Sequence, residues 1–358
     1  MKILHILNTN KYSGAENVVC QIIENCRSDK YEFCYVSLNG PIESILKTRN
    51  IDFVPVSCMS INELSRVFKE YKPDVIHAHD FTTSIISALT MSGLPIISHL
   101  HNNASWLKKF NLKSLAYLLS TVSYRKILTV SDSIINEYIF KNRIKKKTTV
   151  IGNPINLEYI RKKANIDISE YQNFKGYHLI YLGRLSAEKN PIGFLDIVKS
   201  AKKHIPGVKV VMVGDGELID EVKAKIDIEN LCETVTLTGY LENPYGYLKK
   251  SKVICIPSIW EGFGLVAVEA MALGIPVIAS SVGGLKDIVN DKCGKLCSQP
   301  DQYSEEIVRL LIDEDYYKSK SENCLKRALE LANIEKYCDN IKKIYNLVMR
   351  DRKEKENA

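Results

Sequence analysis

The amino-acid sequence predicts an α/β protein made of two doubly wound, parallel-sheet domains that face each other across a cleft. Its 358 residues are too many for one ordinary hydrophobic core. Short β-type runs alternate with helical stretches, which is typical of parallel sheets wrapped by helices. A polar, irregular segment over 163–178 separates two such series. We therefore expect a first domain over residues 1–165, a second over 166–339, and a C-terminal helix over about 340–358 that packs back on the first.

The first half of the chain contains six β-type runs, each short and rich in β-branched or aromatic residues. They are KILHIL (2–7), EFCYVSL (32–38), DFVPV (52–56), DVIHAH (74–79), PIISHL (95–100) and RKILTV (125–130). Helical stretches over 15–26 and 82–92 fall between them. This order predicts a doubly wound sheet, whose ligands are expected beyond the carboxyl ends of its strands.

The second half repeats the alternation with five further runs. They are HLIYLG (178–183), VKVVMVG (208–214), TVTLTG (234–239), KVICIP (252–257) and PVIAS (276–280). Helices are expected over 191–203, 264–273 and 301–312. Gly274 and Pro276 supply the stop signals after the second of these helices.

Composition points to a reduced, cytoplasmic protein. No apolar run approaches the roughly 18 residues of a membrane-spanning helix, and no signal-peptide pattern follows the N-terminus. The ten cysteines are scattered singly along apolar segments. Cys293 and Cys297 lie four residues apart but lack a second ligand pair, so no zinc site is predicted.

Positive charge gathers in residues 101–150, which carry ten Lys and Arg against two acidic residues. Within that segment, Trp106, Lys108, Lys109 and Lys113 belong to the amphipathic pattern WLKKFNLKSLAYLLS. Basic helices with Trp and Leu on the other face bind anionic bilayers. A solvated basic face is the simpler interpretation, and no nucleic-acid reader motif is present. We expect contact with the inner face of the cytoplasmic membrane on the acceptor side, and no nucleic-acid partner.

Three strand ends carry residues suited to a diphosphate. Gly14 follows the first strand and precedes a helix, where backbone N–H groups approach a phosphate. The turn is not G-x-G-x-x-G, which argues against a dinucleotide dehydrogenase. Gly183 ends a strand and is followed by Arg184 and Lys189, a fork and a point charge for phosphate oxygens. Gly214 and the next glycine, in VGDGEL, form another turn where a flat ring has room.

Two glutamates interrupt the apolar segment IWEGFGLVAVEAMALGIPVIAS. Glu261 lies in the loop before the 264–273 helix, and Glu269 lies about a turn and a half inside it. Carboxylates in such surroundings need partners. Two ribose hydroxyls would satisfy Glu269, and sugar hydroxyls would satisfy Glu261. A protein cation is the alternative partner of Glu269.

These motifs in this order resemble family 4 of the retaining, GT-B-fold glycosyltransferases, a group rich in bacterial surface-polysaccharide enzymes. The resemblance covers nearly the whole chain. It rests on the two glutamates spaced as above, on GRLSAEKN and VGDGEL, and on SGAE, IHAHD, HLHN and VIGNPIN in the first half. Ser13, the GNPIN segment and Lys286 depart from the commoner family pattern, which blurs the identity of the sugar.

The resemblance implies a hexosyltransferase that moves a hexose or N-acetylhexosamine, with retention, from a nucleotide-sugar to a lipid-diphosphate-linked or polysaccharide acceptor. UDP is the expected nucleotide, and neither a metal nor a cofactor is expected, because Arg184 and Lys189 would neutralise the leaving diphosphate. The capsule, exopolysaccharide, O-antigen and teichoic-acid pathways all remain open.

The resemblance also assigns residues. The catalytic group would be Glu261, His101, Arg184 and Lys189. The donor-binding group would be Gly14, Gly183, Gly214, Gly216, Gly239, Tyr240, Leu241, Gly262, Phe263, Gly264, Leu265 and Glu269. His101 is chosen because HLHN matches the family position. His79 and His99 are interpreted as hydrogen-bonded structural residues.

Two other functions fit the same fold. One is a non-catalytic GT-B partner subunit of another glycosyltransferase, although such subunits tend to lose the charged residues kept here. The other is a GT-B nucleotide-sugar epimerase, which the spacing of the two glutamates opposes. A glycogen-type phosphorylase would need a far longer chain.

Overall fold

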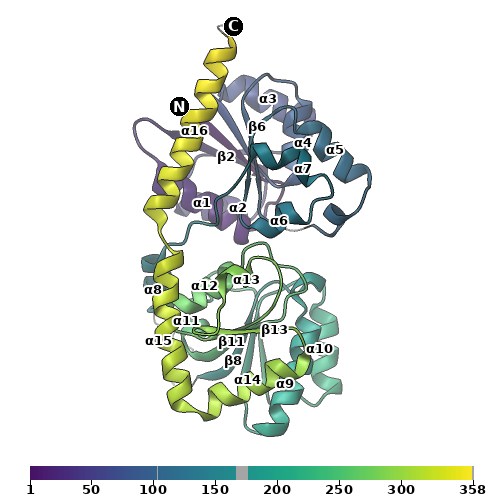
Figure 1. Ribbon diagram of the computed structural model, residues 1–358, viewed down its shortest axis with the longest axis vertical. Helices are drawn as coiled ribbons and strands as arrows, with labels where there is room; N and C mark the ends of the chain where they lie inside the picture. The colour runs from purple at the N-terminus through teal and green to yellow at the C-terminus, as the bar shows by residue number, and fades with distance from the viewer. Residues whose placement is uncertain (103, 167–175, 357–358) are drawn as a thin grey trace. The chain divides into compact units, whose positions relative to one another are not determined.

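The computed structural model describes residues 1–102, 104–166 and 176–356. It divides into two compact units, unit 1 with residues 1–154 and 333–358 and unit 2 with residues 155–332. Each unit is a doubly wound α/β sheet whose strands are all parallel (Figure 1).

Unit 1 contains a seven-stranded sheet in the order β3-β2-β1-β4-β5-β6-β7. The strands are β1 (Lys2–Ile6), β2 (Glu32–Leu38), β3 (Phe53–Val56), β4 (Val75–His79), β5 (Ile96–Leu100), β6 (Tyr124–Thr129) and β7 (Thr148–Val150). The helices are α1 (Gly14–Cys26), α2 (Ile42–Thr48), α3 (Ile61–Tyr71), α4 (Phe81–Leu89), α5 (Leu112–Ser120), α6 (Asp132–Asn136), α7 (Lys141–Ile144) and α16 (Ile334–Glu356), with short 3₁₀ turns η1 (Ser105–Lys108) and η2 (Lys145–Lys147).

Unit 2 contains a six-stranded sheet in the order β10-β9-β8-β11-β12-β13. The strands are β8 (Tyr177–Leu182), β9 (Val210–Val213), β10 (Val235–Gly239), β11 (Ser251–Ile256), β12 (Val277–Ser280) and β13 (Gly294–Cys297). The helices are α8 (Leu157–Ala164), α9 (Pro191–His204), α10 (Ile219–Ile228), α11 (Tyr245–Lys249), α12 (Leu265–Ala272), α13 (Leu285–Ile288), α14 (Pro300–Ile312) and α15 (Glu314–Leu331), with the 3₁₀ turn η4 (Ala187–Lys189).

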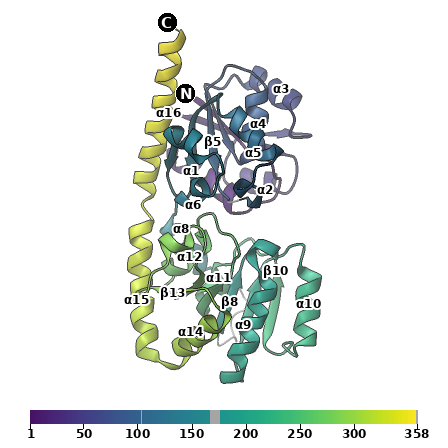
Figure 2. The same cartoon turned by 45° about the vertical axis from the view of Figure 1, so that its right-hand side comes forward.

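The sheet of unit 2 is buried on both faces, because alternate residues of each strand enter two separate cores. Ile180 and Ile254 pack with α8, α11, α12 and α15 on one face. Leu179, Val253 and Met212 pack with α9, α10 and α14 on the other. Figure 2 shows α9 and α10 together beside the sheet. Near-continuous apolar strands are the expected sequence signal of such a sheet.

All eleven predicted strands are present with small differences at their ends, and so are the five helices predicted over 15–26, 82–92, 191–203, 264–273 and 301–312. The sequence analysis missed β7 and β13, which are only three and four residues long. Strands of that length contain too little apolar sequence to stand out from a loop.

The unit boundary falls earlier than the sequence predicted, at 154/155 instead of 165/166. Ile155, Ile160 and Ala164 are buried in the core of unit 2, so α8 belongs to that unit. Part of the irregular segment used for the prediction, 167–175, lies outside the described residues.

The C-terminal helix packs on unit 1, as expected, but it begins earlier, at Ile334. It runs along unit 1 (Figures 1 and 2) and contacts α1 and β4. Tyr345 is fully buried beside Phe33. None of the helices in the described ranges is long and apolar enough to cross a bilayer.

Candidate functional site

The candidate site of unit 2 lies where the sheet changes winding direction. After β8 the chain builds β9 and β10 on one side, and after β11 it builds β12 and β13 on the other. The carboxyl ends of the adjacent strands β8 and β11 are therefore the topological switch point, where open α/β sheets bind their ligands. Lys189 ends the turn after β8, and Glu261 lies in the loop after β11.

These two residues form an ion pair. Lys189 Nζ lies 2.6 Å from Glu261 Oε2, and the Ser258 hydroxyl donates to the same oxygen at 3.3 Å. The Glu261 side chain is only 13% exposed and that of Lys189 30%. The backbone N–H of Ile259 donates to the Glu188 carbonyl at 2.8 Å, which ties the two loops together. Burial makes this pair sensitive to the loss of either partner.

Two glycines in the turn after β12, Gly283 and Gly284, contact the backbone of Glu261. The Gly284 N–H donates to the Glu261 carbonyl at 3.3 Å. A Cβ added to Gly283, which has a φ of +49°, would lie 1.7 Å from that carbonyl oxygen. The turn after β12 can approach this closely only with glycine at 283.

The turn after β9 packs against the loop that carries Arg184. A Cβ on Gly214, whose φ is +143°, would lie 1.9 Å from the Gly183 carbonyl oxygen, and one on Gly216 would lie 2.4 Å from the Leu185 carbonyl oxygen. Arg184 itself is well exposed, with Nη2 3.3 Å from Glu217 Oε2. An exposed pair of this kind holds its cation weakly, so Arg184 is available to an anionic ligand.

Glu269 lies on α12 and is partly buried. Its Oε1 accepts a hydrogen bond from the Tyr245 hydroxyl at 3.1 Å. Burial raises the pKa of Glu269 to about 7, and the bond from Tyr245 opposes part of that rise. The carboxyl group is thus poised to change charge near neutral pH. The sequence analysis missed Tyr245, because nothing in NPYGYLKK separates a carboxylate partner from an ordinary apolar tyrosine.

The remaining predicted donor-binding residues lie at two positions along the same carboxyl edge of the sheet, one after β11 and one at the end of β10, with β8 and β9 between them. Gly264 has a φ of +100° and precedes α12, with Gly262 buried and Phe263 and Leu265 partly buried. Gly239 ends β10; Tyr240 after it is 56% exposed, and Leu241 packs partly on the core. The exposed aromatic ring of Tyr240 offers a flat surface beside the strand ends, on which another ring could stack.

In unit 1, Gly14 begins α1 directly after the loop from β1 and is exposed. The preceding Ser13 hydroxyl donates to the Glu16 carboxylate, whose pKa burial raises. β1 and β4 are adjacent in the sheet, so this loop leaves from the switch point of unit 1.

His101 follows β5 and is buried, and burial lowers its pKa to about 3. Its Nε2 is 2.9 Å from His79 Nδ1. His79 and His99 are also buried and hydrogen-bonded to other histidines, which agrees with their structural interpretation. The sequence analysis overlooked His5 and His77, although histidines recur at alternate positions in HAH (77–79) and HLH (99–101).

Two sets of three buried histidines have ring nitrogens within 4.8 Å of one another. They are His5, His77 and His79, and His79, His99 and His101. Imidazole is a common metal ligand, so the geometry leaves a metal open where the sequence predicted none.

The basic segment of unit 1 differs from the prediction at its tryptophan. Trp106 is partly buried, with its ring 4.7 Å from that of Phe81 in an edge-on contact, so it is not an exposed anchor. Lys108, Lys109 and Lys113 are exposed, although Lys108 Nζ lies 3.4 Å from Glu137. Three apolar side chains stand beside them in solvent, namely those of Phe110 (70% exposed), Leu112 (86%) and Leu119 (64%).

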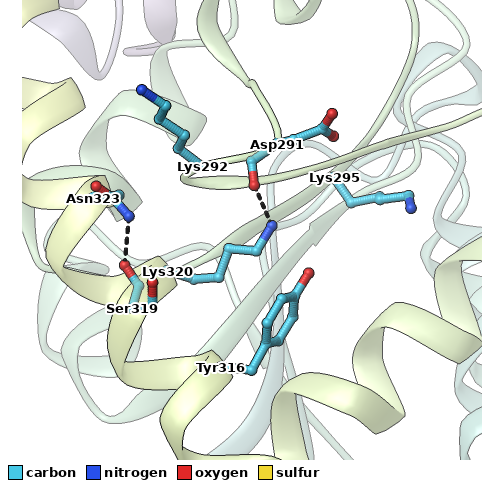
Figure 3. Close-up of a pocket in the computed structure, with 7 residues that line it drawn as sticks. All are labelled: Asp291, Lys292, Lys295, Tyr316, Ser319, Lys320 and Asn323. Carbon is cyan, nitrogen blue, oxygen red and sulfur yellow. Dashed lines mark hydrogen bonds between the residues drawn. The ribbon is translucent and has the colours of Figure 1, made fainter.

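A separate pocket of about 380 Å³ lies near the amino end of β13, away from the carboxyl edge described above (Figure 3). It is lined by Asp291, Lys292, Lys295, Tyr316, Ser319, Lys320 and Asn323. Lys320 donates to the carbonyls of Asp291 and Gly294, which uses its charge inside the fold. No predicted site residue lines this pocket.

Solved structures with the same arrangement of strands and helices show the fold. Anabaena HepE in complex with UDP-glucose matches with a TM-score of 0.86 and 18% identity, over 97% of this chain and 99% of that one. The pneumococcal O-GlcNAc transferase GtfA in complex with UDP and GlcNAc matches with a TM-score of 0.78 and 13% identity, over 98% and 99%. The fold is GT-B, as predicted.

Family models and relatives then define the family. The Glycosyltransferase Family 4 model matches residues 12–159, and the Glycosyl transferases group 1 model matches 163–328. The chain therefore belongs to this glycosyltransferase family. A relative from Escherichia coli, the UDP-Gal:alpha-D-GlcNAc-diphosphoundecaprenol alpha-1,3-galactosyltransferase, is 27% identical over 96% of both chains. A Campylobacter jejuni N-acetylgalactosaminyltransferase acting on an undecaprenol-diphosphate oligosaccharide is 28% identical over 76% of this chain and 75% of its own length.

Proposed function

We propose that the protein transfers a hexose or N-acetylhexosamine, with retention and without a metal, from a UDP-sugar to a lipid-diphosphate-linked saccharide in bacterial surface-polysaccharide synthesis. The observation that carries the proposal is the Lys189–Glu261 ion pair at the switch point of unit 2. It joins a cation suited to a diphosphate and a carboxylate suited to sugar hydroxyls in one place. The name of the Escherichia coli relative states a UDP-sugar donor, and the names of both relatives state acceptors linked to undecaprenol diphosphate, which supports this choice of substrates.

Each charged residue has a defined part in the proposed reaction. Lys189 has three N–H donors and uses one for Glu261, so it can also hold the departing diphosphate. Arg184 adds a second cation, and stabilising the charge that develops on a leaving group is the largest contribution such sites make. Both bonds to Glu261 use Oε2, which leaves Oε1 to accept from the sugar. Glu269 accepts from the ribose, and His101 of unit 1 acts on the donor sugar.

Retention is proposed from the family resemblance, and because these groups include no suitable nucleophile, a double displacement through a glycosyl-enzyme is disfavoured. Glu261 is committed to Lys189 and Ser258, so attack of the acceptor on the face from which the diphosphate leaves is the proposed course. Gly14 at the start of α1 and the N–H groups at the start of α12 add partial positive charge for phosphate oxygens.

The test is nucleotide release from a panel of nucleotide-sugars in EDTA, with and without a bacterial membrane extract as acceptor. Glu261→Ala is compared with wild type and with Glu229→Ala, which removes another Lys–Glu pair of unit 2, that of Lys199 and Glu229. Extract-stimulated release from one donor, retained in Glu229→Ala and lost in Glu261→Ala, is expected. Release that survives Glu261→Ala refutes the assignment, loss of wild-type activity in EDTA refutes metal independence, and no release from any donor favours the non-catalytic partner subunit.

We further propose that the acceptor side of unit 1 docks on an anionic membrane surface, peripherally and from the cytoplasmic side. Phe110, Leu112 and Leu119 supply exposed apolar side chains next to exposed lysines. Each lysine near an anionic surface contributes about 1 kcal/mol. Because Trp106 is partly buried, these three exposed side chains, and not the tryptophan, would insert into the membrane surface.

Vesicle co-sedimentation tests the docking. Binding to phosphatidylglycerol vesicles at low salt, with little binding to phosphatidylcholine vesicles, is expected, and Leu112→Ser with Leu119→Ser should abolish it. Ile228→Ser, at an equally exposed apolar residue of unit 2 (76% exposed), is the control and should bind as wild type does. Equal binding by the double variant and wild type contradicts the assignment of this face.

A further inference from the structure

Five of the seven histidines form one buried cluster, the histidine chain, at the carboxyl ends of β1, β4 and β5. Its members are His5, His77, His79, His99 and His101. His5 is paired in register with His77, and His79 with His99. Burial lowers the pKa of every member, so each imidazole is neutral at pH 7. A neutral imidazole has one N–H donor and one lone pair, and its tautomer decides which nitrogen carries which.

The chain begins at the hydroxyl of Tyr345 on α16 and has two branches. In the long branch, Tyr345 Oη lies 3.5 Å from His5 Nε2, His5 Nδ1 lies 2.8 Å from His79 Nε2, and His79 Nδ1 lies 2.9 Å from His101 Nε2. The hydroxyl of one tyrosine is thereby linked through two imidazole rings, those of His5 and His79, to His101, the residue proposed to act on the donor sugar.

In the short branch, Tyr345 Oη lies 2.8 Å from His77 Nδ1, and His77 Nε2 lies 3.2 Å from His99 Nδ1. A hydroxyl has one proton, so Tyr345 donates to one branch and accepts from the other. Hydroxyl donors typically form bonds of about 2.7–2.8 Å, and N–H donors bonds of about 2.9–3.0 Å. The short contact to His77, against the 3.5 Å contact to His5, favours His77 as the acceptor of the tyrosine proton.

That direction fixes every tautomer in the long branch. His5 donates from Nε2 to the Tyr345 oxygen and accepts at Nδ1 from His79 Nε2–H. His79 then accepts at Nδ1 from His101 Nε2–H. His101 is left with an unprotonated Nδ1, and by the same reasoning His99 ends the short branch with a protonated Nε2.

Both terminal nitrogens, His101 Nδ1 and His99 Nε2, are buried and have no hydrogen-bond partner among the described residues. Their rings lie with centroids 4.2 Å apart. A buried polar atom without a partner is costly, and a ligand hydroxyl, which both donates and accepts, has the chemistry to satisfy such ends.

We propose that Tyr345 is a positioning residue that fixes the tautomer of His101 through the histidine chain, so that His101 Nδ1 accepts a hydrogen bond from a hydroxyl of the transferred sugar. This use of His101 rests on the transferase function proposed above. A metal held by the same histidines is the competing arrangement, but His79 already uses both ring nitrogens in hydrogen bonds to His5 and His101. A metal would have to replace those bonds.

The test is Tyr345→Phe in the full chain, labelled with nitrogen-15 histidine. Imidazole nitrogen-15 shifts distinguish protonated from unprotonated nitrogens, and the His101 signals are assigned by their loss in His101→Asn. Tyr337→Phe is the matched control, because Tyr337 is a buried tyrosine of the same helix whose hydroxyl has no partner among the described residues. We expect Nε2–H and bare Nδ1 at His101 in wild type and Tyr337→Phe, and a mixture with Nδ1–H in Tyr345→Phe.

His5→Gln supplies a second variant if Tyr345→Phe does not fold. It interrupts only the long branch, so the His101 tautomer should change while that of His99 does not. Equal tautomer populations would raise the apparent KM for the donor about twofold, since half of the free molecules would be competent to bind it, with an unchanged turnover number.

Unchanged His101 signals in both variants overturn the proposal, as does a wild type with a protonated Nδ1. A wild-type spectrum that changes on adding EDTA overturns it in favour of a metal site. A wild type that transfers no sugar but shows the expected tautomer change refutes the transferase function and leaves the link from Tyr345 to His101 standing, so the two failures are distinguishable.

Discussion

Replacing Glu269 by glutamine should stabilise unit 2 at alkaline pH and weaken donor binding at the same time. The folded pKa of Glu269 is about 7, against an ordinary value of 4.5. The folded state therefore holds its proton more tightly than the unfolded state. Stability is highest at low pH and is lost as the pH rises from about 4.5 to about 7.

The size of the effect follows from the two pKa values. One pKa unit corresponds to about 1.36 kcal/mol, and between pH 5 and pH 8 the shift costs wild type about 2.5 kcal/mol. Glutamine has nearly the same shape, stays neutral and still accepts from the Tyr245 hydroxyl. The Glu269→Gln protein should therefore gain about 2.5 kcal/mol over wild type across this pH range.

Urea unfolding at pH 5 and pH 8 measures this difference. The chain has two tryptophans, Trp106 in unit 1 and Trp260 in unit 2. In a Trp106→Phe background the fluorescence reports on unit 2 alone, which avoids treating two units as one transition. The reasoning is refuted if the stability difference between Glu269→Gln and its parent is the same at both pH values.

Three further predictions concern the same strand ends. Donor binding at pH 7 should release up to about half a proton in wild type and none in Glu269→Gln, because ribose hydroxyls favour the ionised carboxylate. Calorimetry in buffers of different ionisation enthalpy measures the protons released. Equal proton release by both proteins would contradict the prediction. Lys189→Met should lower kcat/KM about 100-fold or more, because it removes a charge that stabilises the leaving group. Lys189→Arg keeps the charge and should retain part of the rate. Comparable rates in the two variants would show that charge at this position is unimportant. Gly214→Ala should destabilise unit 2 by about 2–4 kcal/mol, because residue 214 has a positive φ and the added Cβ would overlap the backbone of the neighbouring loop. Gly207→Ala, with nothing within 4 Å of the added Cβ, should be tolerated. Urea unfolding compares the two variants, and equal unfolding midpoints would refute the overlap.

The fold could be read from the sequence because its signal is local. The strands of a doubly covered parallel sheet are short apolar runs, and such runs stand out between amphipathic helices. The unit boundary was harder to place, since the buried face of α8 becomes visible only when Ile155 and Ile160 meet the core of unit 2. Trp106 is a second example. The neighbouring lysines suggested that its ring is exposed, but the ring contacts Phe81, which lies far away in the sequence.

The candidate site was predictable residue by residue but not contact by contact. Sequence order placed Lys189 and Glu261 after strands of one sheet, and only the strand order makes those strands neighbours. The partner of Glu269 was predicted to be a ribose or a cation, and in the structure it is the Tyr245 hydroxyl. Such pairs depend on distances across the fold, which periodicity and spacing do not contain.

The chain leaves unit 1 at residue 154 and returns to it only at 333, with all of unit 2 inserted between. On the ribosome, about 180 residues separate the two segments, which at about 5–20 residues per second amounts to some ten to forty seconds. During that interval the nascent first segment has no α16, so His77 lacks Tyr345 and α1 lacks its neighbour. Unit 2 is continuous and can close first, and unit 1 is completed last. A premature stop codon just before α16 would therefore damage the amino-terminal unit and spare the carboxyl-terminal one.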